Sequence, residues 1–462
     1  MLTYDLDRRG KLARYDYLYR CIREDILAGR LTAGEKLPSK RSLASHLQTA
    51  VITVQNAYAQ LEAEGYLYTR EKRGYYVAGV ERHPAAPGRA PARSAPQPQR
   101  SWLLDLSSGG SGTEDFPFSV WAKLMRRVLS EEGEALLRAT PPNGADALRR
   151  AIAQHLYRFR GISAAPEQIV VGAGTEYLYN LIVQLLGREA VYGVEDPGYS
   201  KAARIYALGG ARTAPVLVDE GGVSLRSLEM SDAQILHTSP NHQFPTGAVT
   251  PIGRRQSLLR WAEAREGRYI IEDDYDSEFR FTLRPIPTLQ SIDRAGRVIY
   301  VSTFSRTLSP SLRISYMVLP KSLTERYRAQ LGFYSSTVPA MEQYTLARFL
   351  DEGYFEAHIN RMRKSYRAQR DAVIDTILQS PLGEHCRVSG EDAGLHFLLT
   401  IDTKCTDHVL RADAEGRGVR LSFLSDFALR PGSAPQHTLV VNYPGIDLAH
   451  LDVALNILNS LL

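Results

Sequence analysis

The chain has 462 residues, 44% of them hydrophobic and 23% charged, which is typical of a globular protein of two or three domains. No stretch is long and apolar enough for a transmembrane helix, and residues 1–7 have no basic region leading into an apolar one, so we expect no signal peptide. The widely spaced Cys21, Cys386 and Cys405 match neither a disulfide framework nor a zinc site. We therefore expect a cytoplasmic protein without a metal site or a membrane partner.

The net charge of +5 is unevenly distributed along the chain. Residues 1–101 hold 17 Lys/Arg and 10 Asp/Glu, whereas the remainder holds 39 and 41. A basic N-terminal part on a near-neutral body is consistent with binding to a polyanion, although a solvated basic surface has the same composition.

A proline-rich stretch, 83–100, divides the chain. Its five prolines alternate with Ala, Gly, Arg and Gln, without the hydrophobic period that a packed core needs. We predict an N-terminal domain over 1–80, a linker over 81–101 and a large domain over 102–462.

The N-terminal domain shows three helical patterns and then two short strands. Tyr15, Leu18, Ile22, Ile26 and Leu27 recur at helical spacing. A second short helix follows Ser39 as N-cap, and a third spans about 50–64, with Val54, Ala57, Tyr58 and Leu61 on one face. Strands are expected at 66–68 and 75–77, joined by a basic turn at 71–74. This is the order of a winged helix-turn-helix.

The segments 37–44 and 54–67 resemble the GntR-type DNA-binding domain, and the likeness extends over residues 11–79. The resemblance implies that the third helix enters the major groove of double-stranded DNA and that the wing approaches the backbone. Phosphate contacts would then come from the basic residues, and base contacts from polar residues of the third helix. The expected DNA-binding residues are Lys40, Arg41, Thr53, Gln55, Asn56, Lys72 and Arg73.

The third helix departs from this family at its start. Members usually begin it with a Ser-Arg pair, whereas the matching residues here are Ala50 and Val51, followed by Ile52. Loss of the arginine lowers affinity or changes the sequence that is read, since apolar side chains can contact thymine methyl groups.

The large domain alternates short apolar runs with amphipathic helical segments. This alternation predicts an α/β fold with a mostly parallel sheet, whose ligands bind beyond the carboxyl ends of the strands. The runs lie at 169–171, 190–194, 235–237, 269–271 and 298–301.

Three strand-end segments carry candidate binding chemistry. Residues 172–176, Gly-Ala-Gly-Thr-Glu, open a helix at 177–186 and could hold a phosphate through backbone amides. Tyr199 could stack on a planar ring, or be a packed turn residue. The acidic run 272–274 directly follows a strand; a carboxylate there could keep a pyridine nitrogen protonated, although such a run also suits a solvated loop.

In this order the segments resemble the MocR/GabR-type regulators, which fuse a GntR winged helix to a fold-type I aminotransferase-like domain. The matching runs are 240–247, 272–279 and 310–320, and the likeness covers essentially the whole chain. It implies a homodimer with a pyridoxal phosphate (PLP) site. Asp273 would pair with the pyridine nitrogen, Tyr275 with the ring 3-oxygen and Tyr199 with the ring face, and the phosphate would be held by Gly174, Thr175, Thr303, Ser305 and Arg313.

Arg306 stands where this family has the lysine that forms a Schiff base with PLP. A guanidinium stays protonated and is a poor nucleophile, so no catalytic residue is assigned. The resemblance also implies a carboxylate-binding arginine shortly after 438–446, yet no arginine follows Arg430. Lys201 could hold an anion as a point charge.

Three interpretations of the whole chain remain. The first is a DNA-binding regulator that dimerises through the large domain and senses PLP, noncovalently, or a PLP–amine effector. The second is an active aminotransferase with an accessory DNA-binding domain, which Arg306 opposes. The third is a DNA binder whose large domain holds another anion or no ligand. His237 and His242 flank a turn and are expected to be structural or pocket-lining.

Overall fold

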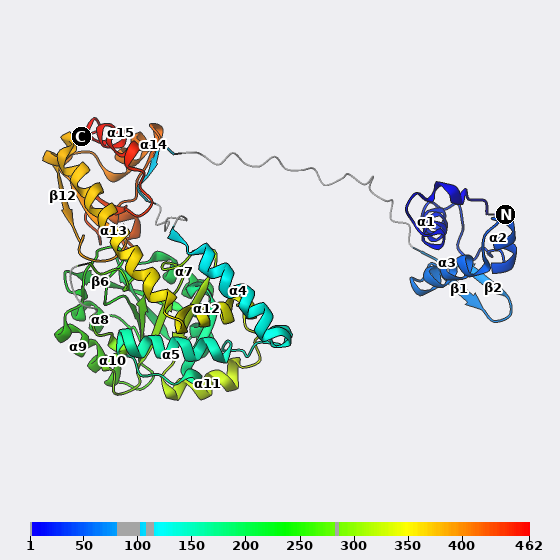
Figure 1. Ribbon diagram of the computed structural model, residues 1–462, viewed down its shortest axis with the longest axis horizontal. Helices are drawn as coiled ribbons and strands as arrows, with labels where there is room; N and C mark the ends of the chain where they lie inside the picture. Colours follow the sequence, from blue (N-terminus) through cyan, green and yellow to red (C-terminus); the bar gives the residue numbers. More distant parts are fainter. Residues whose placement is uncertain (1, 81–101, 108–114, 282–285) are drawn as a thin grey trace. The chain divides into compact units, whose positions relative to one another are not determined.

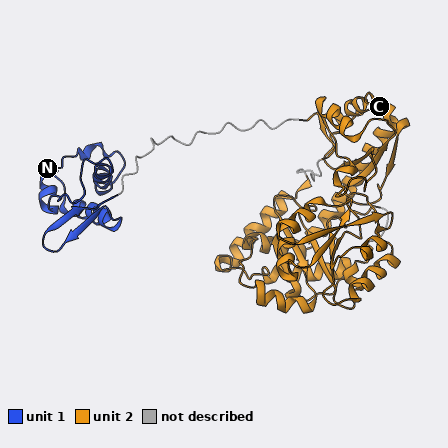
Figure 2. Cartoon of the chain, turned by 180° about the vertical axis from the view of Figure 1, so that it is seen from behind, with its two compact units in different colours: residues 1–99 blue, residues 100–462 orange. Residues whose placement is uncertain are grey.

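The computed structural model describes residues 2–80, 102–107, 115–281 and 286–462. These residues form two compact units, Met1–Gln99 and Arg100–Leu462 (Figure 2). The predicted linker, 81–101, lies outside the described residues. No helix in the described ranges is long and apolar enough to cross a membrane.

Unit 1 has the expected order of helices followed by an antiparallel hairpin (Figure 1). Ser39 caps the second helix, because its hydroxyl accepts the amide N–H of Ser42. The elements are η1 (Leu6–Arg9), α1 (Arg14–Leu27), α2 (Lys40–His46), α3 (Val51–Ala63), β1 (Leu67–Arg70) and β2 (Gly74–Val77).

The core of unit 1 is formed by the apolar faces of its helices. All four residues expected on the inner face of α3 are buried. The buried face of α1 is narrower than the helical spacing predicted, because two residues of that pattern, Tyr15 and Leu27, are 44% and 39% exposed. Leu27 is rotated about 100° from the buried Ile26, and Tyr15 lies in the first turn of the helix.

Unit 2 is built on a mixed, mostly parallel sheet covered by helices (Figure 1). Among the described residues its strand order is β4-β11-β10-β9-β8-β5-β6-β7, in which β11 and β7 run antiparallel to their neighbours. The strands are β4 (Ile169–Ala173), β5 (Val191–Asp196), β6 (Arg212–Asp219), β7 (Gly222–Val223), β8 (Ile235–Thr238), β9 (Tyr269–Asp274), β10 (Val298–Thr303) and β11 (Ile314–Val318).

The C-terminal part of unit 2 adds a small antiparallel sheet. Its order is β12 (Cys386–Ser389), β13 (His396–Ile401) and β15 (Thr438–Asn442). A separate parallel pair joins β3 (Leu104–Asp105) to β14 (Val419–Arg420).

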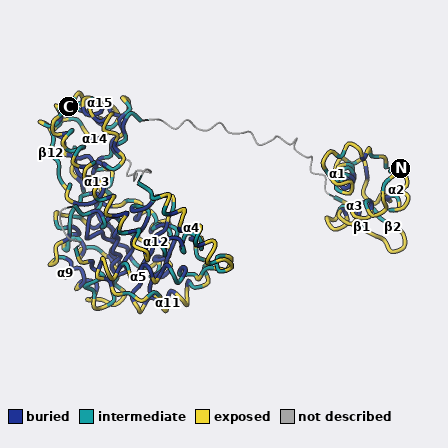
Figure 3. The backbone as a smooth tube through the Cα atoms, in the orientation of Figure 1, coloured by how far each residue is buried: buried dark blue, intermediate teal, exposed yellow. Residues whose placement is uncertain are grey.

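The helices of unit 2 bury their apolar faces against these sheets. Figure 3 shows the buried segments running through the interior of the unit, as expected for strands covered on both faces. The helices are α4 (Phe118–Glu132), α5 (Asp146–Arg160), α6 (Thr175–Leu186), α7 (Ser200–Leu208), α8 (Leu225–Met230), α9 (Ile252–Glu263), α10 (Leu289–Ile292), α11 (Lys321–Leu331), α12 (Ala340–Asp351), α13 (Tyr354–Gln379), α14 (Asp407–Gly416) and α15 (Leu448–Asn459), with 3₁₀ turns at Gly133–Leu137, Pro166–Gln168, Pro381–His385 and Leu424–Phe427.

The acidic run 272–274 does not follow strand β9, as the sequence suggested, but forms its second half. Glu272 accepts the N–H groups of Leu289 and Gln290, each at 2.8 Å. Asp274 pairs with the buried Arg160 and accepts further side-chain hydrogen bonds. A solvated loop is therefore excluded, because Glu272 and Asp274 are buried in the strand and hydrogen-bonded to partners within the fold.

Candidate functional site

The candidate ligand site lies where β4, β8, β9 and β10 end. The cavity has a volume of about 320 Å³, at the carboxyl ends of the parallel strands, where open α/β sheets bind ligands. It brings together all nine candidate cofactor residues: the eight to which the family resemblance gave a role toward PLP, and Arg306 at the lysine position. Its lining is Gly174, Thr175, Glu176, Tyr179, Tyr199, Lys201, Ser239, Phe244, Asp273, Tyr275, Thr303, Ser305, Arg306, Pro310 and Arg313.

Asp273 forms the deep end of the cavity and is only 7% exposed. Its Oδ2 accepts a hydrogen bond from the Tyr179 hydroxyl, and Nε2 of His237 lies 3.3 Å away. The Tyr206 hydroxyl is 2.7 Å from Nδ1 of His237, so Tyr206 can donate to the ring while the ring donates to Asp273. Oδ1 of Asp273 is buried and has no hydrogen-bond partner among the residues that the structure describes. One buried acceptor is thus available to a hydrogen-bond donor on a ligand, such as a protonated ring nitrogen.

Tyr275 lines the same cavity and is held protonated by its surroundings. Burial raises the pKa of its phenol well above the usual value, and the charge of Asp276 adds to the shift, whereas Arg306 opposes it. Burial likewise raises the pKa of Tyr199, and Lys201 opposes that shift. Both phenols can therefore act as hydrogen-bond donors near neutral pH.

The other end of the cavity has the geometry of an anion cradle. Gly174 adopts a φ of +90°, a backbone conformation that residues with a Cβ rarely adopt, and Nη2 of Arg313 lies 2.7 Å from where a Cβ would be. Thr175 is the first residue of α6, and the amide groups in the first turn of a helix have no partner within it, which suits them to bind an anion. The Thr303 hydroxyl accepts the N–H of Ser305 at 3.1 Å, which fixes the turn after β10.

Arg306 lies on the wall of this cavity, in the turn after β10. Arg430, the last arginine of the chain, is not among the described residues that line it. Its Nε donates to Oδ2 of the fully buried Asp196 at 3.0 Å. Within the described ranges, the cations that line the cavity are therefore Arg306, Arg313 and Lys201.

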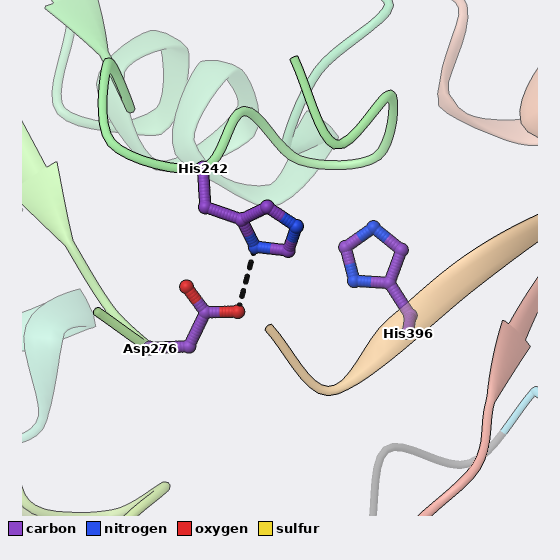
Figure 4. A group of neighbouring side chains, drawn as sticks. All are labelled: His242, Asp276 and His396. Atoms are coloured by element: carbon purple, nitrogen blue, oxygen red, sulfur yellow. Dashed lines mark hydrogen bonds and ion pairs between the residues drawn. The ribbon is translucent and has the colours of Figure 1, made fainter. Parts of the chain in front are cut away.

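A second cluster lies next to Tyr275, where His242, Asp276 and His396 converge from three separate segments (Figure 4). Nδ1 of His242 is 2.8 Å from Oδ2 of Asp276, and Nε2 of His396 is 3.0 Å from the carbonyl oxygen of Pro245. Each histidine thus has a hydrogen-bond partner at one ring nitrogen, whereas Nε2 of His242 is buried without a partner among the described residues. The structural or pocket-lining role of His242 and the absence of a metal both stay predictions.

Sequence spacing gave no sign of this cluster, because its members are distant along the chain. His242 and Asp276 follow the neighbouring strands β8 and β9, and only the packing of β13 adds His396. Gly394 makes the approach possible: its φ is +76°, and a Cβ on it would lie 1.9 Å from Cε1 of His242. Burial lowers the pKa of His396 to about 3, and the neighbouring His242 adds to the shift.

In unit 1 most of the predicted DNA-binding residues lie on the surface. Gln55 and Asn56 are exposed on α3, as are Lys72 and Arg73 in the turn between β1 and β2 and Arg41 on α2. Thr53 is half-buried. Lys40 is half-buried too, and its Nζ lies 5.7 Å from the centre of the Tyr75 ring.

The start of α3 also presents apolar side chains to solvent. Val51 and Ile52 are 43% and 57% exposed. Side chains of this exposure contribute little to the core of unit 1. They are available for contact with another surface.

Comparison with known families divides the chain in the same way. Residues 14–77 match the family described as bacterial regulatory proteins, gntR family. Residues 103–413 match the family aminotransferase class I and II.

Similar proteins with curated descriptions are regulators. A probable rhizopine catabolism regulatory protein, MocR, of Rhizobium meliloti is 34% identical, with 98% of this chain and 95% of that protein covered. An uncharacterized HTH-type transcriptional regulator of Bacillus subtilis, YdeL, is 38% identical over 91% of each chain. The HTH-type pyridoxine biosynthesis transcriptional regulator PdxR of Corynebacterium glutamicum is 34% identical over 88% of this chain and 87% of its own.

Solved structures that resemble unit 2 are aminotransferases. The kynurenine aminotransferase of Pyrococcus horikoshii has a TM-score of 0.69 at 22% identity, covering 79% of this chain and 91% of that one. The α-aminoadipate aminotransferase LysN of Thermus thermophilus has a TM-score of 0.67 at 26% identity, covering 78% and 91%. The chain therefore belongs to the MocR-type HTH transcriptional regulators, in which a GntR winged helix is joined to a fold-type I aminotransferase domain.

Proposed function

We propose that this protein is a DNA-binding transcriptional regulator whose aminotransferase-like unit binds PLP, or a PLP-derived amine, without covalent attachment. The observation that carries the proposal is Oδ1 of Asp273, which is buried at the deep end of the cavity without a hydrogen-bond partner within the described part of the chain. A buried acceptor without a partner is costly unless a ligand supplies the donor. A pyridinium N–H is such a donor.

The remaining lining residues fit the other groups of the same ligand. Tyr275 would donate to the ring 3-oxygen and Tyr199 would cover the ring face. The phosphate would lie at Gly174, whose positive φ favours glycine, with Thr175, Thr303, Ser305 and Arg313 around it. PLP supplies an electrophilic aldehyde when bound, and Arg306 would place a guanidinium rather than an amine in that part of the cavity.

The absence of a lysine at position 306 is the reason to propose sensing rather than turnover. A guanidinium keeps its proton at physiological pH and can form ion pairs or bidentate hydrogen bonds. Arg306 would therefore hold an anionic group of the ligand. We propose that this unit has no aminotransferase activity.

Unit 1 would supply the regulatory output in the cytoplasm. The exposed cations of the wing, Lys72 and Arg73, would neutralise phosphates, and Gln55 and Asn56 would read base edges in the major groove. A homodimer formed through unit 2 would present two winged helices to paired half-sites of an operator. A small-molecule effector would change the affinity for the operator by binding differently to the two arrangements of the dimer.

The test of the ligand is a titration of the purified full chain with PLP, followed by absorbance and tryptophan fluorescence. One half of the sample is desalted, and the other is treated with borohydride and examined by mass spectrometry. We expect saturable binding that desalting reverses, with no reduced adduct. A stable, reducible adduct would favour the interpretation as an active aminotransferase. If PLP does not bind, the protein would be a DNA binder whose large domain holds another ligand or none.

The DNA-binding part is tested by selecting sites from random duplexes with the full chain, with and without PLP. We expect enrichment of two copies of one half-site at a fixed spacing. Failure to enrich any sequence would contradict operator recognition.

A further inference from the structure

Glu176 places a carboxylate at the entrance of the anion cradle. It is the second residue of α6, directly after Thr175. Its Oε1 accepts a hydrogen bond from Nζ of Lys201 at 2.8 Å, and its Oε2 accepts one from Nη2 of Arg313 at 3.4 Å. Glu176, Lys201 and Arg313 all line the cavity. Two of the cations that line it are therefore paired with a carboxylate of the chain itself.

This carboxylate is ionised near neutral pH. The hydrogen bond from Lys201 lowers the pKa of Glu176, and Arg313 adds to the shift while burial opposes it. A ligand phosphate in the cradle would carry the same sign of charge as Glu176 and would need the same guanidinium. Two anions beside the same guanidinium repel each other, so the ligand phosphate and the Glu176 carboxylate compete for Arg313.

The fold does not depend on these ion pairs. The side chains of Glu176, Lys201 and Arg313 are 39%, 55% and 53% exposed, and ion pairs of such exposure contribute little to stability. An acidic residue in the first turn of a helix also interacts favourably with the helix dipole. That local role explains why a carboxylate is tolerated there, but it requires neither Lys201 nor Arg313 as a partner.

We propose that Glu176 is an internal competitor of anionic ligands, so that phosphate binding in this protein displaces the carboxylate from Arg313. The proposal deepens the proposed function and rests on it for the identity of PLP as the phosphate carrier. The competition itself needs only an anion in the cradle. Ligands with a phosphate dianion are favoured over monoanions, because only the stronger anion offsets the loss of the internal ion pair.

The displacement also connects the cradle to α7. Lys201 is the second residue of α7 and follows Tyr199 by two positions. Once phosphate takes Arg313, Glu176 retains Lys201 as its remaining partner, so the occupancy of the cradle changes the charge balance at the start of α7.

The test is the Glu176→Gln variant of the full chain, compared with wild type by isothermal titration with PLP, inorganic phosphate and pyridoxal. Glutamine preserves the size of the side chain and removes its charge. We expect PLP and inorganic phosphate to bind roughly three- to tenfold more tightly, from the loss of two partly exposed ion pairs. Pyridoxal, which has no phosphate, should bind as it does to wild type.

Glu189→Gln is the matched control, since Glu189 is an exposed carboxylate of the same unit that does not line the cavity. It should leave all three affinities unchanged. Urea unfolding of both variants, followed by tryptophan fluorescence, checks that the fold is retained.

The outcomes separate this inference from the proposed function. Unchanged or weaker phosphate and PLP binding by Glu176→Gln would overturn the inference while leaving PLP binding by wild type intact. A wild type that binds inorganic phosphate but not PLP would contradict the proposed cofactor, and tighter phosphate binding by the variant would still support the competition. Failure of both proteins to bind either anion would refute both.

Discussion

The two compact units use charged groups in opposite ways. The cations predicted to contact DNA in unit 1, such as Lys72 and Arg73, are exposed and need no partner in the fold. The acids of β9 in unit 2 are 0–7% exposed and depend on buried partners. An exposed surface like that of unit 1 tolerates the apolar side chains of Val51 and Ile52, because the fold does not rely on them. A buried network of the second kind restricts every member to residues that complete it.

The largest effect is expected when position 306 receives the lysine that the family has there. Arg306→Lys should convert reversible PLP binding into a covalent, borohydride-reducible adduct at position 306, because an amine can condense with the aldehyde. Mass spectrometry of peptides after reduction checks this, with wild type treated in parallel. If no adduct forms at position 306, the remainder of the cavity does not position PLP as proposed.

A smaller effect is expected at the deep end of the cavity. Asp273→Asn replaces the carboxylate with a neutral amide, and should weaken PLP binding by about 1.5–3 kcal/mol, the usual contribution of a hydrogen bond to a charged group. The measurement is a PLP titration, with Asp232→Asn as the control, since Asp232 is exposed and away from the cavity. Equal affinities of the variant and wild type would contradict the role of Oδ1.

Acid should destabilise unit 2 through His396. Burial lowers the pKa of this histidine to about 3, from an ordinary value of 6.5. The unfolded chain therefore binds more protons between those values, and stability is lost as the pH falls from about 6.5 towards 3. For His396 alone, this amounts to about 2 kcal/mol between pH 7 and pH 5.

The His396→Gln variant isolates this contribution, because glutamine keeps an N–H that can reach the carbonyl oxygen of Pro245. Glu272, whose pKa burial raises to about 7, shifts stability in the opposite direction but is common to both proteins. Urea unfolding at pH 7 and pH 5, followed by tryptophan fluorescence, reports unit 2 because Trp102, Trp121 and Trp261 all belong to it. A variant as acid-sensitive as wild type would show that His396 is not the titrating group.

The smallest effect is expected for the exposed cations of unit 1. Lys72→Gln with Arg73→Gln should weaken DNA binding about tenfold at moderate salt and lower the slope of log K against log salt by about 2, one unit for each phosphate that is no longer neutralised. The weakening should be the same for operator and random DNA. Fluorescence anisotropy across a salt series measures it, with Lys11→Gln and Arg14→Gln as the control pair. A weakening confined to the operator would mean that the wing reads bases.

Local patterns in the sequence were sufficient for the winged helix and for the parallel strands of unit 2. Helical spacing identified the buried face of α3, and Ser39 was recognised as a cap, because both are decided within a few residues. The candidate cofactor residues came instead from the resemblance to the MocR/GabR-type regulators, and the cavity unites them because strand-end motifs of an α/β sheet meet at one edge. Their roles toward PLP and DNA remain predictions that the experiments above address.

Tertiary structure alone decided which charged groups became partners. The sequence by itself determined two folded units, their order and the residues at the strand ends, because periodicity and capping are local. It could not show that Glu176 meets Arg313, 137 positions away, or that His242, Asp276 and His396 converge. It also placed the acids of β9 after the strand rather than within it, since burial of a carboxylate depends on partners that only the folded chain brings within reach.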